Sequence, residues 1–466
     1  MMNARSINSF AAETLRPLQE YGLLAVITLL ALFLRFFRLG EWSFWGDEVF
    51  SLGTKPDGFI QSTTSLLIHW VTGLIGTNEW SARLAPALIG TISVPLLYIP
   101  IRKQFGAPTA LLAAALLAVS PWHIYWSQNA RFYVLLLLFY TYALLVFFIG
   151  LEQDKPLYFI ASLIFFGLAA KERMLALAFL PVSLGYLLCL QFLPFERPAG
   201  FRLRNLAIFF GPLIMLGLLF AWPFLQDVPG WLRGFSRINT TPFWLFSGTV
   251  YYVGLTVILM AATGALYYLG KLNRAALYFS LGAGVPLGII LVTSLFQYTA
   301  NRYAFVSLTS WIILAAMAAR ELFARLHGSL RIFAVGVLAL LLLTSMSEDI
   351  LYYQYQNGNR ENWRSAFEFI QEQRQAGEPV VVDRTEIGRY YLQDGVVSYR
   401  QMEPQEALQH KRVWFVEDMN VAELFPEQLA WVKENAHQVA DFDVQANARL
   451  FKMRVYLFEN TAGSSP

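Results

Sequence analysis

Apolar runs of a length that suits transmembrane helices follow one another from residue 20 to residue 347, separated by short polar and charged loops. A helix needs about 20 residues to cross the hydrocarbon core of a bilayer. The pattern therefore predicts about eleven transmembrane helices. Their expected ranges are 20–39, 83–101, 107–123, 132–150, 157–171, 174–192, 205–224, 246–269, 275–296, 302–320 and 330–347.

The composition excludes an ordinary soluble domain. Hydrophobic residues make up 56% of the chain and charged residues 14%, whereas soluble domains carry about 45–50% and about 25%. The net charge of +3 is too small to suggest a nucleic-acid partner. The first apolar run is longer than the core of a signal peptide, and Arg35-Phe-Phe-Arg38 stands where a cleavage site would need small residues. We therefore expect this run to be a retained span.

The distribution of lysine and arginine in the short loops predicts the orientation. With a cytoplasmic N-terminal tail at 1–19, the inner loops are basic and the outer loops, beginning with 40–82, have mixed charge and many aromatic residues. An odd number of spans places the C-terminus outside. The basic residues of the predicted inner loops are Arg102, Lys103, Lys155, Arg197, Arg202, Arg204, Lys271, Arg274, Arg320, Arg325 and Arg331.

The chain becomes polar after the last apolar run, and 348–466 predicts a small extracytoplasmic α/β domain. An amphipathic helix is expected at 361–375. Apolar, β-branched runs predict buried strands at 378–383, 413–416 and 454–458.

The first outer loop carries two adjacent acids, Asp47 and Glu48, beside Trp42, Phe44 and Trp45. Charges at a membrane boundary are costly and tend to mark function. A partly dry aromatic setting suits a carboxylate to proton abstraction. The same pair could instead bind a divalent cation through its oxygens, or both acids could be solvated loop charges.

A second cluster runs from Ser120 to Tyr133, at the outer ends of the third and fourth predicted spans. Arg131 would lie at headgroup depth, where a guanidinium can bind a phosphate with two parallel hydrogen bonds. The alternative is an arginine that only reaches the interface. His123 could be a ligand or proton carrier, or could form local hydrogen bonds.

Three further outer positions are weaker candidates. Lys171-Glu172-Arg173 could be functional or a self-neutralised turn between two spans. His69 lies in an expected interfacial helix at 66–75, and Arg302 opens the tenth span as another candidate phosphate contact. The chain contains no P-loop, dinucleotide glycine fingerprint, CxxC or HExxH motif. P-loop ATP hydrolysis, hydride transfer and thiol chemistry therefore lose support.

Several of these segments together resemble the GT-C membrane glycosyltransferases, especially the protein O-mannosyltransferase and lipid A aminoarabinose transferase group. The segments are Leu34-Arg-Phe-Phe-Arg-Leu39, the loop with Asp47-Glu48, Asn78-Glu-Trp-Ser-Ala-Arg83-Leu, and Ser120-Pro-Trp-His-Ile-Tyr-Trp-Ser-Gln-Asn-Ala-Arg131-Phe-Tyr133. One stretch departs from the family. Its members often carry His-Pro-Pro-Leu after the acidic pair, where this chain reads Thr63-Thr-Ser-Leu-Leu-Ile-His69.

The resemblance implies a transmembrane glycosyltransferase domain at 20–347 that takes a sugar from a polyprenyl-phosphate donor. The acceptor, a lipid, glycan or protein, would be reached on the periplasmic or exterior side of a bacterial inner membrane. Asp47 would be the base, with Glu48 in support, in an inverting single displacement. The donor phosphate would meet Arg131, and also Arg302 and Lys171.

The supporting residues for the acceptor would be His123, Tyr133, Glu172 and His69, and a divalent metal at Asp47 and Glu48 stays open. Two other classes compete with the transferase. A transporter or flippase of a lipid-linked solute would also have many spans and intramembrane arginines, although no inverted repeat is visible. A non-catalytic scaffold would leave Asp47, Arg131 and Arg302 far apart.

Overall fold

The computed structural model describes residues 4–53, 62–233, 241–446 and 449–460, and most of them form helices. Within this part of the chain, seven helical segments are long and apolar enough to cross a membrane, or nine if two bent pairs each count as one span. The seven are Leu18–Phe36, Glu79–Phe105, Tyr133–Gln153, Met174–Phe192, Arg274–Thr293, Asn301–Arg325 and Gly328–Gln354.

The two bent pairs break where the sequence favours a helix start. Helices α5 (Ala107–Ala118) and α6 (Pro121–Ser127) meet at 59°, with Pro121 in the first turn of α6. Helices α11 (Pro242–Val253) and α12 (Leu255–Leu269) meet at 94°. Gly254 between them has a φ of 95°, which glycine adopts without the steric cost of a side chain.

All eleven predicted ranges lie on helices, although the count of eleven spans remains a prediction. Helix α8 has 17 residues, and the part of α10 with described side chains includes the short apolar segment Leu203–Leu219. The remaining membrane-domain elements are α1 (Ala4–Phe36), α4 (Glu79–Phe105), α7 (Tyr133–Gln153), α8 (Pro156–Glu172), η1 (Met174–Ala178), α9 (Phe179–Phe192), α10 (Leu203–Arg233), α13 (Arg274–Thr293), η2 (Asn301–Ser307), α14 (Leu308–Arg325), η3 (Gly328–Leu330) and α15 (Arg331–Gln354).

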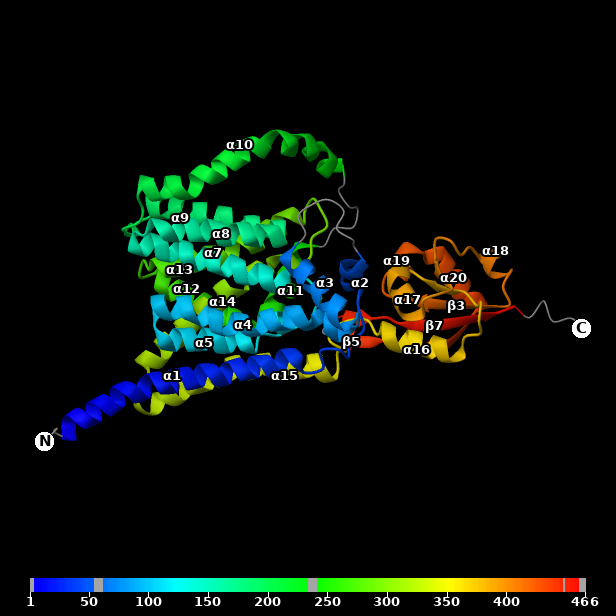
Figure 1. Ribbon diagram of the computed structural model, residues 1–466, viewed down its shortest axis with the longest axis horizontal. Coiled ribbons are helices and arrows are strands. Elements are labelled where there is room, and N and C mark those ends of the chain that lie inside the picture. Colours follow the sequence, from blue (N-terminus) through cyan, green and yellow to red (C-terminus); the bar gives the residue numbers. More distant parts are fainter. Residues whose placement is uncertain (1–3, 54–61, 234–240, 447–448, 461–466) are drawn as a thin grey trace, which may run out of the picture.

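The helices differ greatly in how much of their surface the protein itself covers. The apolar windows of α7 and of η2 with α14 are 78% and 83% buried, whereas those of α1 and of η3 with α15 are 11% and 17% buried. The exposed side chains of α1 and α15 are largely leucine, phenylalanine, valine and isoleucine. Such surfaces are stable against lipid chains. The protein is therefore an integral membrane protein, with α7 and α14 inside the bundle and α1 and α15 at its edge (Figure 1).

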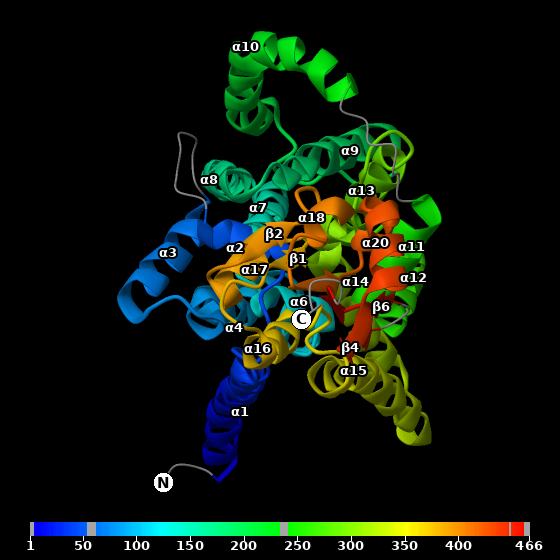
Figure 2. The ribbon, with the colours of Figure 1, turned by 90° about the vertical axis from the view of Figure 1, so that its right-hand side faces the viewer.

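Helix α10 leaves the bundle and arches away from it in both ribbon views (Figures 1 and 2). The N-terminal part of α10 packs against α8, and Phe209 in this part is buried in the core. Farther along, Ile214, Met215, Leu218 and Leu219 are exposed. The helix continues to Arg233, beyond the predicted span end at 224.

Two short helices, α2 (Gly46–Gly53) and α3 (Thr63–Ile75), occupy the predicted first outer loop at 40–82. Residues 54–61 of that loop lie outside the described residues, as do residues 1–3 of the expected tail at 1–19. From Ala4 onwards that tail belongs to α1. At the other end, α15 extends to Gln354, past the expected domain boundary at 348.

The C-terminal region is a small α/β domain, as the sequence predicts. Its five-stranded sheet has the order β2-β1-β3-β7-β4, with β2, β1 and β3 parallel and β7 antiparallel to β3 and β4. The predicted strands are β1, β3 and β7, and the predicted helix is α16. The elements are α16 (Trp363–Gln373), β1 (Val380–Val382), α17 (Thr385–Leu392), β2 (Val396–Ser398), α18 (Pro404–Ala407), β3 (Arg412–Glu417), α19 (Val421–Leu424), α20 (Pro426–Asn435), β4 (His437–Asp441), β5 (Val444–Ala446), β6 (Arg449–Phe451) and β7 (Arg454–Glu459).

This domain covers the end of the bundle at which α1 ends and α2 begins (Figure 2). Helix α17 packs on α2. The Tyr391 hydroxyl accepts a hydrogen bond from the Phe44 N–H (2.9 Å) and donates one to Glu79 (2.7 Å), and Arg364 pairs with the same Glu79 at 2.6 Å. The first outer loop therefore lies between the membrane helices and the C-terminal domain.

Candidate functional site

Asp47 and Glu48 lie in the first turn of α2 but face different surroundings. The Glu48 amide donates to the Trp45 carbonyl (2.9 Å), which starts the helix. Acids are favourable in this turn because the unpaired N–H groups carry partial positive charge. Successive helical residues point about 100° apart. As a result Glu48 is fully buried, while the Asp47 side chain is 36% exposed.

The Glu48 carboxylate is held by two arginines and one backbone amide. Arg83 donates to both oxygens at 2.8 Å, Arg360 donates to Oε2 at 3.0 Å, and the Ala130 N–H donates to Oε1 at 2.8 Å. Burial acts to raise the pKa of Glu48, but Arg83 and Arg360 outweigh burial and hold it below its usual value. Glu48 is therefore an ionised structural centre, with both oxygens engaged.

Arg83 fixes the path of the chain between α1 and α2. Besides Glu48, it donates to the carbonyls of Leu39 (3.2 Å), Trp42 (2.9 Å) and Ser43 (3.0 Å). An arginine at the start of an apolar helix is costly unless it is paired, and that cost is a sequence signal for this position. Arg83 stands in the segment Asn78–Leu84, from which no role for it was predicted.

Asp47 faces a group of arginines instead of a complete set of partners. Arg131 lies 3.7 Å from the Asp47 carboxylate, and its Nη1 donates to the Asp47 carbonyl (2.9 Å) and to Ser51 (2.6 Å). The Nε of Arg131 is buried without a partner among the described residues. Burial, with the nearby charges of Arg173 and Arg302, lowers the pKa of Arg131 although Asp47 acts to raise it.

Three arginines from separate segments thus share one electrostatic environment with Asp47. Arg131 precedes α7, Arg173 follows α8, and Arg302 lies in η2. The guanidinium groups of Arg131 and Arg173 lie 5.1 Å and 5.3 Å from the centre of the Phe132 ring. One carboxylate beside three guanidiniums leaves an excess of positive charge, which suits the binding of an anion such as a phosphate.

Glu172, the last residue of α8, caps the start of α3 instead of neutralising its neighbours. Its carboxylate accepts from the Thr63 and Thr64 amides at 2.8 Å and 3.3 Å and from the Thr64 hydroxyl at 2.8 Å. It satisfies N–H groups at the start of that helix, as a capping residue does. Within the described chain no acid pairs with Lys171 or Arg173, and both are exposed. Arg173, for which the sequence left a functional role and a self-neutralised turn both open, therefore joins the cationic set.

His123 lies in the bundle, away from Asp47. Its Nδ1 is 2.8 Å from Arg35 and its Nε2 is 3.3 Å from the Ser93 hydroxyl. Arg35 also donates to the last carbonyls of α5, at Leu117 and Ala118 (3.0 Å and 2.9 Å). These contacts hold the break between α5 and α6 in place.

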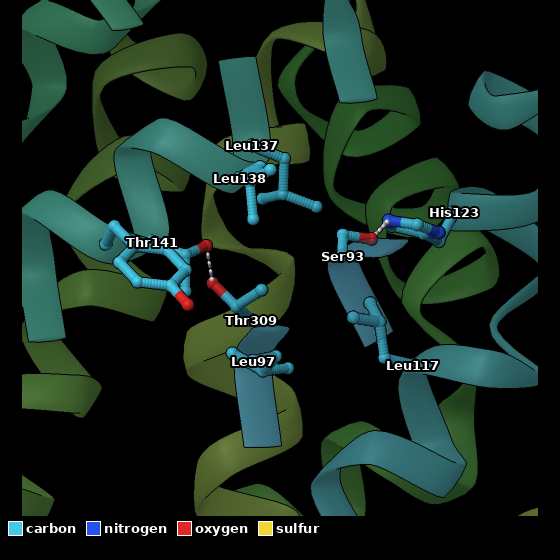
Figure 3. A pocket seen from close by; sticks show the side chains of 9 residues that line it. Ser93, Leu97, Leu117, His123, Leu137, Leu138, Thr141 and Thr309 are labelled. Carbon is cyan, nitrogen blue, oxygen red and sulfur yellow. Dashed lines mark hydrogen bonds between the residues drawn. The ribbon is translucent and has the colours of Figure 1, made fainter. Parts of the chain in front are cut away.

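A small, mostly apolar pocket adjoins His123 (Figure 3). Four leucines line it, and a Thr141–Thr309 hydrogen bond of 2.9 Å lies on another side. Neither Asp47 nor any of the three arginines lines it. The lining residues are Ser93, Leu97, Leu117, His123, Leu137, Leu138, Thr141, Tyr142 and Thr309.

Two other predicted residues make local contacts. His69 Nδ1 lies 2.8 Å from the carbonyl of Ser65, one turn back in α3. Tyr133 is buried against Trp126 and Phe132, next to the charges of Arg131 and Arg302. Among the described residues, no group of three or more histidine, cysteine or acidic side chains is arranged to hold a metal ion. The acidic pair alone, with Glu48 saturated, is a poor metal site.

The sequence profile described as dolichyl-phosphate-mannose-protein mannosyltransferase matches residues 63–222. Two candidate mannosyltransferases of Bacillus subtilis (strain 168) are also similar. YycA is 23% identical over 37% of this chain and 25% of its own length. YkcB is 24% identical over 50% of this chain and 31% of its own length. The chain thus matches less than a third of either relative.

Solved structures extend the likeness to nearly the whole chain. ArnT from Cupriavidus metallidurans in the apo state has a TM-score of 0.59 at 15% identity, over 96% of this chain and 99% of that chain. The chain therefore shares the fold of ArnT, and its residues 63–222 also match the mannosyltransferase profile. ArnT bound to undecaprenyl phosphate gives a TM-score of 0.56 at 16% identity, over 96% and 99% of the two chains.

A further solved structure, the apo oligosaccharyltransferase of Archaeoglobus fulgidus, has a TM-score of 0.57 at 11% identity. It covers 86% of this chain and 70% of that chain. At such identities the likeness is one of fold. The ArnT match includes the C-terminal α/β domain as well as the membrane helices, since only 4% of this chain falls outside it.

Proposed function

We propose that this protein transfers a sugar from a polyprenyl-phosphate donor to an acceptor on the outer side of the membrane, by an inverting single displacement. One observation carries the proposal: partly exposed Asp47 lies 3.7 Å from Arg131, and the nearby charges of Arg173 and Arg302 add positive charge that one carboxylate does not balance. A base beside an anion site is what a transfer from a phosphate-linked sugar requires.

The reaction needs few groups. The acceptor hydroxyl oxygen attacks the anomeric carbon, Asp47 takes the hydroxyl proton, and the carbon–oxygen bond to phosphate breaks. The phosphate oxygen leaves with the bonding electron pair, so negative charge on the phosphate grows as the bond breaks. Arg131, Arg173 and Arg302 stabilise that charge, because fixed cations in a partly dry site act on developing charge without reorganising. Attack opposite the leaving group inverts the anomeric carbon.

The other predicted residues take supporting roles. Lys171, which is exposed and two residues before Arg173, adds positive charge to the set of three arginines. Tyr133 lies near the charges of Arg131 and Arg302, while Glu172 caps α3, the helix that carries His69 and contacts α2. His123 acts from a distance, through the break between α5 and α6 that precedes Arg131. Glu48 holds the helix that carries Asp47.

The descriptions of two similar proteins support a polyprenyl-phosphate donor. The matching family profile names dolichyl-phosphate mannose, and one ArnT structure contains undecaprenyl phosphate. The basic inner loops support a cytoplasmic N-terminus, eleven spans and a C-terminal domain on the periplasmic or exterior side of a bacterial inner membrane. The acceptor would be a lipid, glycan or protein hydroxyl that reaches Asp47 from that side.

The test is donor turnover in Asp47→Asn. Purified protein in proteoliposomes is given undecaprenyl-phosphate hexoses and pentoses, and release of undecaprenyl phosphate is measured. Loss of the base lowers donor turnover about 100- to 10,000-fold. The free energy of unfolding stays unchanged. Glu41→Gln is the matched control, since Glu41 is an exposed acid of the same loop paired with Arg38. Near-normal turnover in Asp47→Asn would exclude the base role.

A deletion strain identifies the substrates. Mass spectrometry of its envelope glycans and lipids should show one sugar missing from one acceptor. If instead the sugars are unchanged and a lipid-linked solute accumulates on the inner side, a flippase replaces the transferase.

A further inference from the structure

The linker between α15 and α16, residues 355–362, is held against the first outer loop by an unusual backbone. Asn357, Gly358 and Asn359 all have positive φ, at 47°, 63° and 56°. Residues other than glycine and asparagine rarely adopt a backbone conformation with positive φ. Three such residues in a row turn the linker sharply back towards α1 and α2.

Gly358 meets the Trp42 indole in a contact that leaves no room for a side chain. A Cβ at this position would lie 2.7 Å from ring atoms of Trp42. Trp42 is itself buried and donates to Gln128 (3.3 Å). On the other side of the turn, the Glu361 carbonyl accepts from the Ser43 hydroxyl at 2.6 Å. The linker thus packs against and hydrogen-bonds to Trp42 and Ser43, which precede α2.

Arg360 projects from this turn into the centre of the loop. It is 2% exposed and donates to Glu48 at 3.0 Å, to the Gln128 carbonyl at 3.4 Å and to the Gly358 carbonyl at 3.2 Å. Its partners therefore come from α2, from the end of α6 and from the linker itself. Arg83 already pairs with Glu48 from the membrane domain, so Arg360 is the contribution of the C-terminal half.

We propose that Arg360 is a positioning residue for sugar transfer: it fixes Glu48, and through Glu48 the pose of Asp47 one residue earlier in α2. The proposal rests on the proposed transferase function. Arg360 touches none of the three arginines of the anion site and so acts on the base without altering donor binding. A displacement of about 1 Å in a catalytic group can cost about 100-fold in rate.

The experiment compares Arg360→Gln with Arg364→Gln in the full-length protein in proteoliposomes. Arg364 is a matched control because it also joins the C-terminal domain to the membrane domain, through Glu79 and the Gly40 carbonyl, without touching Glu48. In Arg360→Gln, kcat falls about 10- to 100-fold with the donor KM within about twofold. Arg360→Lys, which retains the charge, recovers part of the loss. Arg364→Gln changes kcat little.

A second readout does not depend on the reaction. Hydrogen exchange of the α2 amides, Gly46–Gly53, should accelerate in Arg360→Gln and stay unchanged in Arg364→Gln. If the wild-type protein transfers no sugar but this exchange pattern appears, the proposed function fails and the positioning of α2 by Arg360 stands. Equal exchange in the two variants, or a donor KM that rises with kcat unchanged, overturns the positioning role. Should Arg360→Gln not fold, Arg360→Lys, which keeps the charge beside Glu48 but lacks the planar guanidinium, is compared with Arg364→Lys in the same exchange measurement.

Discussion

Glu48 in the membrane domain and Asp418 in the C-terminal domain are both fully buried carboxylates, yet their surroundings are opposite. Glu48 has two arginines and a backbone amide. Asp418 accepts from the Asn420 and Val421 amides through Oδ1 (2.8 Å and 3.0 Å), and its Oδ2 has no partner among the described residues.

Their charges differ accordingly. The arginines hold the pKa of Glu48 below its usual value despite burial. Burial, with the like charges of Glu361 and Asp383, raises the pKa of Asp418 to about 7. Burial alone therefore does not decide whether an acid is charged; the partners decide. Glu48 therefore stays ionised and holds α2 in place through its ion pairs, whereas the raised pKa of Asp418 lies near neutral pH.

The largest effect is expected from Glu48→Gln, which leaves Arg83 and Arg360 without their counter-charge. Breaking a buried ion pair from one side costs about 3–5 kcal/mol. Denaturant unfolding of the detergent-purified protein measures the loss. Because the folded pKa of Glu48 is depressed, its contribution is present above the ordinary pKa of 4.5 and disappears as the pH falls through the lower folded value. If the free energy of unfolding falls by less than about 1 kcal/mol, the range of a surface ion pair, then the buried ion pairs of Glu48 do not stabilise the fold as proposed.

A smaller effect of opposite sign is expected from Asp418→Asn. The folded pKa of Asp418 is raised, so the folded state binds the extra proton between pH 4 and pH 7 and loses stability as the pH rises through that range. The difference from 3.8 to about 7 corresponds to at most about 4 kcal/mol, and we expect a gain of about 2 kcal/mol above pH 8. Asp443→Asn is the control, since Asp443 pairs with Arg454 at 2.8 Å and its loss should destabilise. An unchanged pH profile in Asp418→Asn would refute the assignment.

The smallest effect is expected from Glu361→Gln. The amide keeps the acceptor for the Trp363 indole N–H (2.9 Å) and removes a like charge near Asp418. The pKa of Asp418 then falls, and the alkaline loss of stability shrinks by about 1 kcal/mol. The measurement is again unfolding between pH 5 and pH 9. If the profile keeps the wild-type midpoint and depth, Glu361 does not act on Asp418.

Helix positions were predictable from the sequence because hydrophobic length is a local property. Every predicted span lies on a helix, and strands at β1, β3 and β7 followed from apolar runs. The bends at α5–α6 and α11–α12 were not predicted, since an apolar run does not reveal that a helix stops and restarts within it. The same holds for the departure of α10 from the bundle, which depends on packing against α8.

The site was predictable only in part. Asp47 and Arg131 stood out as charges at the membrane boundary, but adjacency concealed the difference between Asp47 and Glu48, which depends on the direction in which each faces from α2. For Arg173 the sequence left a functional role and a self-neutralised turn both open. Its sequence neighbour Glu172 caps α3 instead, and neighbours in sequence on a helix do not face each other. Arg360 lies more than 300 residues from Glu48, a contact that no local pattern contains.

The seam between the two domains limits how this protein can be recombined. Phe44, Glu79 and Glu48 are each held by residues of the C-terminal half, Tyr391, Arg364 and Arg360. Exchanging the outer domain with that of another protein of this fold would remove all three contacts at once and leave Glu48 with only Arg83 and the Ala130 N–H. A functional chimera would need to carry the first outer loop and the start of α4 with the outer domain, so the unit of exchange crosses the apparent boundary between them.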